Sequence, residues 1–137
     1  LAGEFPIVDV LDDVQLCIDR LADKGPVNIT GYCYGGTVVW LAACRCERPN
    51  AAPSYYGRHA VSFLEETPKC AVILHFGEQD KSIPIEEVHK MEAAYPGLPT
   101  YIYDADHGFN SDRRVNYDDA AGTLALERTL ARFAENA

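Results

Sequence analysis

The spacing of apolar residues predicts helices that alternate with short strands. In the opening segment, apolar residues recur at helical spacing with charged residues between them, which predicts an amphipathic helix over residues 7–24. Gly25-Pro26 ends this helix, because proline cannot continue it and glycine accepts the left-handed cap conformation. A strand is predicted at residues 27–30. The run at residues 37–43 is apolar on nearly all sides and predicts a buried helix.

The middle of the chain predicts two more strands. Residues 51–57 form a short apolar and aromatic stretch, in which Pro53 favours an edge strand or a strand start, since proline has no N–H for the ladder. A loop or short helix follows. Residues 70–77 are the clearest strand, because a continuous apolar run is typical of a parallel strand that is covered on both faces.

The last third predicts a helix, a strand and a closing helix. The helix begins near Pro84 and presents Val88, Met91 and Tyr95 on one face. Residues 99–104 predict a fourth strand. A helix over residues 117–135 then closes the chain, and its predicted core stripe consists of Leu126, Leu130 and Phe133.

This alternation predicts the α/β class, as a three-layer sandwich with a parallel sheet and right-handed crossovers. In such sheets ligands bind beyond the carboxyl ends of the strands. The residues that follow the strands are therefore the candidates for chemistry. They are Cys33 after the first strand, Asp80 after the third and His107 after the fourth.

Composition narrows the classes of function. The 137 residues suit one domain, and a mean hydropathy of −0.17 excludes a membrane span. With 12 basic and 21 acidic residues, the net charge of −9 disfavours nucleic acid and anionic membranes as partners. A small anionic substrate would need a local cation, and the only basic doublet is Arg113-Arg114. Five cysteines without disulfide or zinc-knuckle spacing favour a reducing cytoplasm.

Cys33 lies in the sequence GYCYGG, where a strand meets a helix. A buried, inert cysteine is the common alternative. The glycines favour a reactive one: Gly31 and Gly35 make room for a strained turn that exposes the thiol, and Gly36 lets the helix pack close to the sheet. With Asp80 and His107, the chain order is the nucleophile, acid and histidine order of α/β-hydrolases.

Each candidate residue has a chemical role in acyl transfer. The helix N-terminus and a nearby histidine would lower the pKa of the Cys33 thiol. His107 would take the thiol proton and later protonate the leaving oxygen, while Asp80 would hold the imidazole in its productive tautomer. The backbone N–H of Tyr34 would form half of an oxyanion hole.

The motifs GYCYGG, SYYG, GEQDKSIP and ADHGFN together resemble the dienelactone hydrolase family (carboxymethylenebutenolidases) over nearly the whole chain. The resemblance implies hydrolysis of a small lactone or enol-lactone ester through a cysteinyl acyl-enzyme, with no metal and no cofactor. It maps the nucleophile onto Cys33, the acid onto Asp80 and the histidine onto His107. Well-known members carry an arginine shortly after the histidine for the substrate carboxylate, a role that here would pass to Arg113 or Arg114.

The family is longer at its N-terminus, so residues 1–137 resemble the C-terminal portion of a single α/β-hydrolase domain without its N-terminal strands. The strand at residues 27–30 would then be a bare sheet edge. Either a missing segment or a second copy of the chain pairs with it, or the 137 residues are only marginally folded. Without the second oxyanion donor, the 137 residues alone would hydrolyse esters slowly.

Two alternatives to a hydrolase stay open. The chain could be a catalytically silent fragment or interaction module that keeps the triad by descent, or a thiol redox sensor that uses Cys33. The remaining histidines receive no role: His75 is expected inside a strand, and His59 and His89 in solvent. Cys44 and Cys46 lie two residues apart on a helix and do not share a face, which disfavours a metal site.

Overall fold

The chain alternates helices and strands, as its apolar pattern predicts. The structure, a computed structural model, describes residues 7–137. Its elements are α1 (Ile7–Ala22), β1 (Val27–Asn28), β2 (Gly31–Tyr32), α2 (Tyr34–Arg45), β3 (Pro49–Tyr55), the short 3-10 helix η2 (Ala60–Ser62), β4 (Ala71–Gly77), α3 (Ile85–Ala94), β5 (Thr100–Tyr103) and α4 (Asp119–Glu135). The predicted α/β class is confirmed.

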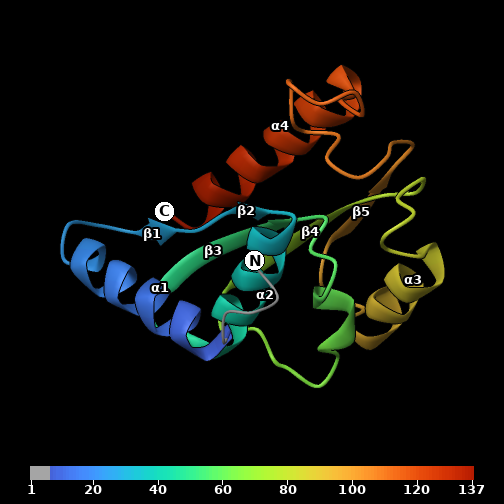
Figure 1. Cartoon of the computed structure of the whole chain (residues 1–137). Coiled ribbons are helices and arrows are strands. Elements are labelled where there is room, and N and C mark those ends of the chain that lie inside the picture. The colour runs from blue at the N-terminus through green and yellow to red at the C-terminus, as the bar shows by residue number, and fades with distance from the viewer. Residues whose placement is uncertain (1–6) are drawn as a thin grey trace.

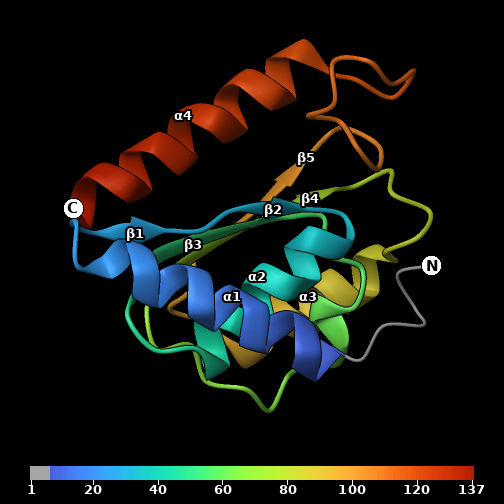
Figure 2. The same ribbon diagram turned by 60° about the vertical axis from the view of Figure 1, so that its left-hand side comes forward.

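All strands pair in parallel in one sheet of order β1-β3-β4-β5, and β2 also pairs with β3. Helix α4 covers one face of this sheet, and α1, α2 and α3 lie on the other (Figures 1 and 2). This is the expected three-layer arrangement. Strand β4 is buried along nearly its whole length, because it lies inside the sheet between the two helical layers.

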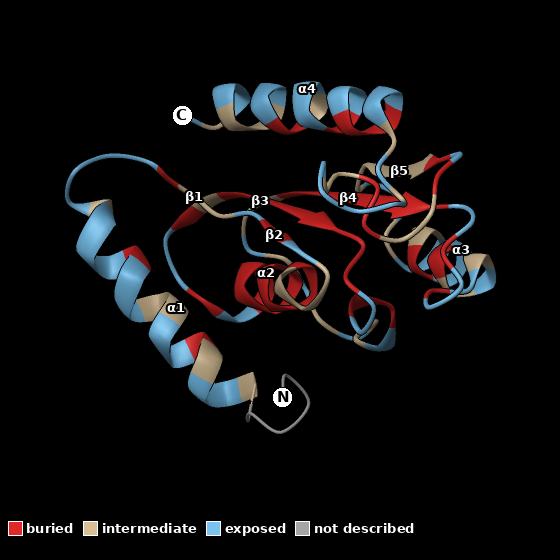
Figure 3. Cartoon of the chain, turned by 45° about the horizontal axis from the view of Figure 1, so that its top comes forward, coloured by how far each residue is buried: buried red, intermediate tan, exposed pale blue. Residues whose placement is uncertain are grey.

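Helix α2 is the most buried helix of the fold. Every residue from Gly36 to Cys44 is buried, and Figure 3 shows the helix pressed against the underside of the sheet. Its apolar composition on nearly all sides therefore has the expected structural cause. Because α2 begins directly after Cys33, its packing fixes the position of that residue.

Helix α4 does not use the predicted core stripe. Leu126 and Leu130 are about half exposed, whereas the buried face consists of small residues and a threonine, namely Ala121, Gly122, Ala125 and Thr129. The reason is a polar contact: the Thr129 hydroxyl hydrogen-bonds the hydroxyl of Tyr55 at 2.7 Å and Nε2 of His75 at 3.1 Å. Small residues on that face let the helix approach the aromatic rings of the sheet.

The prediction for Pro53 is also wrong. Strand β3 is internal, with β4 on one side and β1 and β2 on the other. Pro53 pairs with Ile73, and its carbonyl oxygen accepts a hydrogen bond from the Thr30 hydroxyl at 3.0 Å. Pro53 thus lies opposite the interruption between β1 and β2. No backbone acceptor of the edge strand is left without a donor there, although proline has no N–H.

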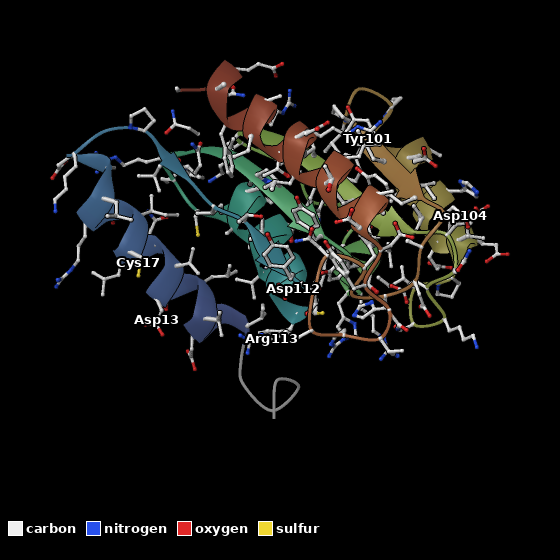
Figure 4. The ribbon with its side chains drawn as sticks, turned by 90° about the horizontal axis from the view of Figure 1, so that it is seen from above. Asp13, Cys17, Tyr101, Asp104, Asp112 and Arg113 are labelled. Carbon is white, nitrogen blue, oxygen red and sulfur yellow. The ribbon has the colours of Figure 1, made fainter. Side chains whose placement is uncertain are left out.

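The first predicted strand is split into β1 and β2, which together form one edge of the sheet. Gly31 and Tyr32 belong to this edge, because they pair with Ser54 and Tyr55. Among residues 7–137, β1 and β2 pair with no strand except β3. An apolar groove of about 490 Å³ lies between this edge, α1 and α2, and its lining includes Asp13 and Cys17 of α1 (Figure 4).

No helix within residues 7–137 has the length and apolar character needed to cross a membrane.

Candidate active site

Cys33 lies at the turn between β2 and α2 in a strained backbone conformation. Its φ is 55° and its ψ is −120°, values that few residues other than glycine adopt. The Cys33 N–H donates to the Tyr55 carbonyl oxygen at 3.1 Å, which ties the turn to the end of β3. The structure therefore has the sharp turn that the glycine-flanked motif predicts.

Two of the three glycines leave no space for a side chain. A Cβ at Gly31 would lie 2.3 Å from the Gly35 carbonyl oxygen, and one at Gly36 would lie 2.4 Å from the Tyr55 carbonyl oxygen. Gly35 is different from the prediction, because nothing lies within 4 Å of a Cβ built there. Gly35 lines the open groove beside α1, so the close contact between Gly31 and Gly35 involves the Gly35 carbonyl group and not its Cα.

Asp80 follows β4, and several hydrogen-bond donors hold its carboxylate. Its Oδ1 accepts hydrogen bonds from the Ser82 N–H and hydroxyl, both at 2.8 Å, and from the Ile83 N–H at 3.2 Å. Its Oδ2 lies 2.5 Å from Nδ1 of His107. Burial works to raise the pKa of Asp80, but the hydrogen bonds from His107 and Ser82 outweigh it and hold the pKa below its ordinary value.

His107 lies on the loop after β5, and Asp80 fixes its ring. Because a carboxylate accepts from Nδ1, that nitrogen carries the proton and Nε2 is left as the basic atom of a neutral imidazole. The Tyr56 ring lies 5.0 Å from the imidazole, between centroids, and limits the ring's movement. His107 and Cys33 line the same cavity, which has a volume of about 270 Å³.

The expected lowering of the Cys33 pKa is wrong. Burial raises the pKa of the thiol above its ordinary value, Arg114 opposes this shift, and Asp80 adds to it. The thiol is desolvated by the turn and by the residues around it. The raised pKa favours the protonated form of the Cys33 thiol over the thiolate.

The cysteine is flanked by two cavities. One is the cavity of about 270 Å³ that it shares with His107, which we call the histidine-side cavity. The other has a volume of about 420 Å³ and is lined by Tyr32, Cys33, Tyr56, Gly108, Asn110, Ser111, Asp112 and Arg114, and we call it the loop-side cavity. A ligand at Cys33 would thus have space on two sides of this residue.

Of the two predicted substrate arginines, the structure brings one to the cysteine. Arg114 lines the loop-side cavity and packs over Gly108, where a Cβ would lie 3.1 Å from its Nη1. Arg113 is exposed on the same loop, next to Asp112 (Figure 4), and lines neither of the two cavities. Both arginines are exposed, and of the two only Arg114 lines a cavity that Cys33 also lines.

Tyr34 is the first residue of α2, so its backbone N–H has no acceptor within the helix. It follows Cys33 directly, as the oxyanion-hole prediction requires, and Tyr34 is among the residues that line the histidine-side cavity.

Sequence reasoning missed three contributors. Ser82 holds Asp80, and the spacing D-x-S was a usable signal, because an aspartate often accepts from the backbone two residues on. Tyr56 lies against His107, and Arg58 lines the histidine-side cavity. Neither shows a signal in the sequence, since both depend on how the turn after β3 packs on α2.

The other expectations concern the remaining histidines and two of the other cysteines. His75 is buried in β4, whereas His59 and His89 are exposed, as predicted. Cys44 and Cys46 are buried and free. Within residues 7–137, no group of three or more histidine, cysteine or acidic side chains is arranged to hold a metal ion.

A profile of the dienelactone hydrolase family matches residues 7–137. The chain belongs to this family. The "Putative carboxymethylenebutenolidase" of Salmonella typhimurium is 34% identical over 98% of this chain and 57% of the relative, and that of Escherichia coli K12 is 33% identical over 97% and 56%. The "Carboxymethylenebutenolidase" of Pseudomonas putida is 31% identical over 78% of the chain and 48% of the relative.

Solved structures agree with the fold. The crystal structure of a "Putative Dienelactone Hydrolase" from Klebsiella pneumoniae superposes with a TM-score of 0.88 at 29% identity, over 98% of this chain and 64% of that one. A "putative hydrolase of the alpha/beta superfamily" from Xanthomonas campestris, at 15% identity and a TM-score of 0.70, shares the fold over 96% of this chain and 70% of its own. This member of the dienelactone hydrolase family spans about half the length of the curated relatives that it matches.

Proposed function

We propose that this chain carries the active site of a hydrolase that cleaves a lactone or enol-lactone ester through Cys33, His107 and Asp80. The observation that carries the proposal is the pairing of a strained Cys33 with an aspartate-anchored His107 on one cavity. Such an arrangement of nucleophile, base and orienting acid is the general requirement of covalent acyl transfer. We further propose that the 137 residues are the C-terminal portion of one hydrolase domain.

The chemistry follows from the protonation states. As the Cys33 sulfur attacks the ester carbonyl carbon, Nε2 of His107 takes the thiol proton, and Asp80 stabilises the resulting imidazolium. The Tyr34 N–H donates to the oxyanion of the tetrahedral intermediate. The bond to the leaving oxygen then breaks and His107 returns its proton to that oxygen. Water attacks the thioester in the same manner, which releases the acid and restores the thiol.

Arg114 supports a substrate that carries a carboxylate. It lines the loop-side cavity together with Cys33, and its charge acts on the thiol. A guanidinium can hold a carboxylate in two parallel hydrogen bonds and so orient the ester. Arg113, the other residue of the doublet, lines neither cavity and would act only through its longer-range charge.

The test is the capture of the acyl intermediate. The wild-type chain, incubated with phenyl acetate and with a small enol lactone, should gain one acyl group on the peptide that contains Cys33, measured by mass spectrometry. Cys33→Ala should lose both the adduct and turnover. Cys17→Ala is the matched control, because Cys17 is exposed on α1, and should behave as the wild type. Full turnover by Cys33→Ala would overturn the proposal.

The same experiment separates the two alternatives. A silent module would form no acyl adduct on any ester. A redox sensor would oxidise reversibly with peroxide and form no thioester, but its reactive form is a thiolate, which the raised pKa of Cys33 disfavours.

A further inference from the structure

Tyr56 follows the one internal strand whose end the proposed chemistry does not use. The loops after β2, β4 and β5 carry Cys33, Asp80 and His107. Strand β3, which lies between β2 and β4, ends at Tyr55, and Tyr56 comes directly after it. The Cys33 N–H donates to the Tyr55 carbonyl oxygen at 3.1 Å. Because the carboxyl ends of parallel strands meet at one edge, Tyr56 belongs beside the candidate nucleophile.

The backbone of Tyr56 is strained, as is that of Cys33. Its φ is 36°, in the left-handed region that bulky residues rarely adopt. The Tyr56 N–H donates to the His75 carbonyl oxygen at 2.7 Å, and a Cβ on Gly57 would lie 2.7 Å from the Gly36 carbonyl carbon. The strand and α2 thus hold this turn from two sides. Strain of this kind persists only where the surrounding structure enforces it, and it is concentrated at functional sites.

Packing holds the Tyr56 ring between the histidine and the loop-side cavity. Tyr56 is only 2% exposed. Its ring centroid lies 5.0 Å from that of His107 and 5.2 Å from that of Phe109. Tyr56 nevertheless lines the loop-side cavity, together with Cys33. The ring is therefore buried and fixed at the wall of a cavity that the thiol shares.

The Tyr56 hydroxyl has the Cys33 thiol and the Asn110 backbone N–H among its polar neighbours. Burial raises the pKa of Tyr56, negative charge on Cys33 raises it further, and the hydrogen bond from the Asn110 N–H opposes this shift. The phenol is therefore neutral at every pH at which an ester is stable. Because the Asn110 N–H occupies an acceptor site of the phenol oxygen, the O–H proton can be donated to another atom.

We propose that the Tyr56 hydroxyl is a further catalytic group, which donates a hydrogen bond to the Cys33 sulfur while that sulfur carries negative charge. The inference rests on the proposed function, to which it adds a residue. Charge develops on the sulfur as His107 takes the thiol proton. It develops again when the C–S bond of the hydrated thioester breaks, because the electron pair returns to sulfur before His107 protonates it. Hydrogen bonds to charged atoms are stronger than neutral ones, so the donor acts at these two moments.

The first test titrates the thiol and needs no ester. The rate at which iodoacetamide alkylates Cys33, measured from pH 6 to 10 by mass spectrometry of its peptide, reports the thiolate fraction. Tyr56→Phe removes the hydroxyl, keeps the ring against His107 and Phe109, and should therefore fold. We expect the pKa of Cys33 to rise by about one unit in this variant, and alkylation at neutral pH to slow about tenfold.

Tyr101→Phe is the matched control. It removes a phenol hydroxyl from β5, and Tyr101 lines neither of the two cavities at Cys33. Its alkylation profile should follow that of the wild type. Arg114 and Asp80 also act on the pKa of the thiol, but they are the same in all three proteins, so the difference isolates the Tyr56 hydroxyl. A Tyr56→Phe profile that coincides with the wild type, or an equal shift in Tyr101→Phe, would overturn the proposal.

The second test measures turnover of phenyl acetate. Tyr56→Phe should lower kcat/KM about tenfold or more, with the loss in kcat, because the donor acts on the charged sulfur and not on the bound ester. Urea unfolding checks that the variant is folded. A loss confined to KM would indicate a packing role and overturn the proposal. If wild-type Cys33 forms no acyl adduct with any ester, the proposed function fails, whereas an adduct combined with an unshifted Tyr56→Phe thiol profile overturns this inference alone.

Discussion

The buried His75 should make the fold sensitive to acid. It lies in β4 with no exposed surface, and its Nδ1 and Nε2 hydrogen-bond the Tyr103 hydroxyl at 2.9 Å and the Thr129 hydroxyl at 3.1 Å. Burial, with a further contribution from Arg128, lowers the pKa of His75 from 6.5 to about 3. The imidazole is therefore neutral in the folded chain at every pH above that value.

The sign of the effect follows from proton binding. Between pH 6.5 and 3 the unfolded chain binds a proton at His75 and the folded chain does not, so acid favours unfolding. Each pH unit in this window costs about 1.4 kcal/mol, and the contribution lost between pH 7 and 4.5 is about 2.5 kcal/mol. That is a large part of the 5–15 kcal/mol that typically stabilises a domain.

His75→Phe removes the titration and keeps an aromatic ring in place. The Tyr55 ring lies 4.3 Å away between centroids and can pack on the new ring. The two former partners keep other hydrogen bonds, because Arg128 donates to Tyr103 and the Tyr55 hydroxyl bonds Thr129. The variant should therefore fold.

The assay is urea unfolding at pH 7.0, 6.0, 5.0 and 4.5 for both proteins. Other acid-sensitive groups, including Asp80, act equally in the two, so the difference between the curves isolates His75. We expect the free energy of unfolding of the wild type to fall by about 2.5 kcal/mol more than that of His75→Phe over this range. Parallel pH profiles would refute the reasoning.

Four further predictions concern the site and the sheet. Asp80→Asn should lower kcat by a factor on the order of 1,000 to 10,000 with little change in KM, because the asparagine would hold the His107 imidazole in the wrong tautomer. A raised KM with an unchanged kcat in steady-state kinetics would contradict this prediction. Arg114→Gln should slow hydrolysis of an ester with a carboxylate on its acyl half about tenfold and spare the neutral ester, whereas Arg113→Gln should spare both; an equal loss for the two esters would indicate a structural role. Gly31→Ala should lower the free energy of unfolding by about 1–3 kcal/mol in urea titrations, because its Cβ would meet the Gly35 carbonyl; an unchanged midpoint would count against that contact. Thr30→Lys places a charge between β1 and β2, on the edge that carries no further strand within residues 7–137, and should reduce self-association of the chain in size-exclusion chromatography; a wild-type chain that elutes as a monomer would remove the basis for this expectation.

The position of the candidate site could be predicted because it depends on topology alone. In a parallel sheet all carboxyl ends meet at one edge, so Cys33, Asp80 and His107 could be placed together from the order of the elements. The turn at Cys33 could be predicted from Gly31 and Gly36, because these glycines act on the local backbone. These features need only the apolar pattern and the short motif.

What could not be predicted depends on contacts between distant elements. The buried face of α4 is chosen by Thr129, whose partners Tyr55 and His75 lie far away in the sequence. The Cys33 pKa depends on burial, which no local pattern gives. Arg58 reaches the histidine-side cavity because Gly57 packs on Gly36, where a Cβ on Gly57 would lie 2.7 Å from the Gly36 carbonyl carbon.

The loop that carries Arg113 and Arg114 is built in a different way from the turn at Cys33. Val115, at its tip, is 99% exposed, and short backbone turns such as the one from the Ser111 N–H to the Gly108 carbonyl hold the segment. Substitutions in this loop should cost little folding free energy, whereas Gly31 and Gly36 in the turn at Cys33 leave no space for a side chain. Libraries randomised at residues 112, 113 and 115 should therefore yield mostly folded proteins, and the variants at Asp112, which lines the loop-side cavity, should differ in ligand preference. Natural selection has the same freedom, so a single scaffold of this fold can acquire new ligand preferences through this loop.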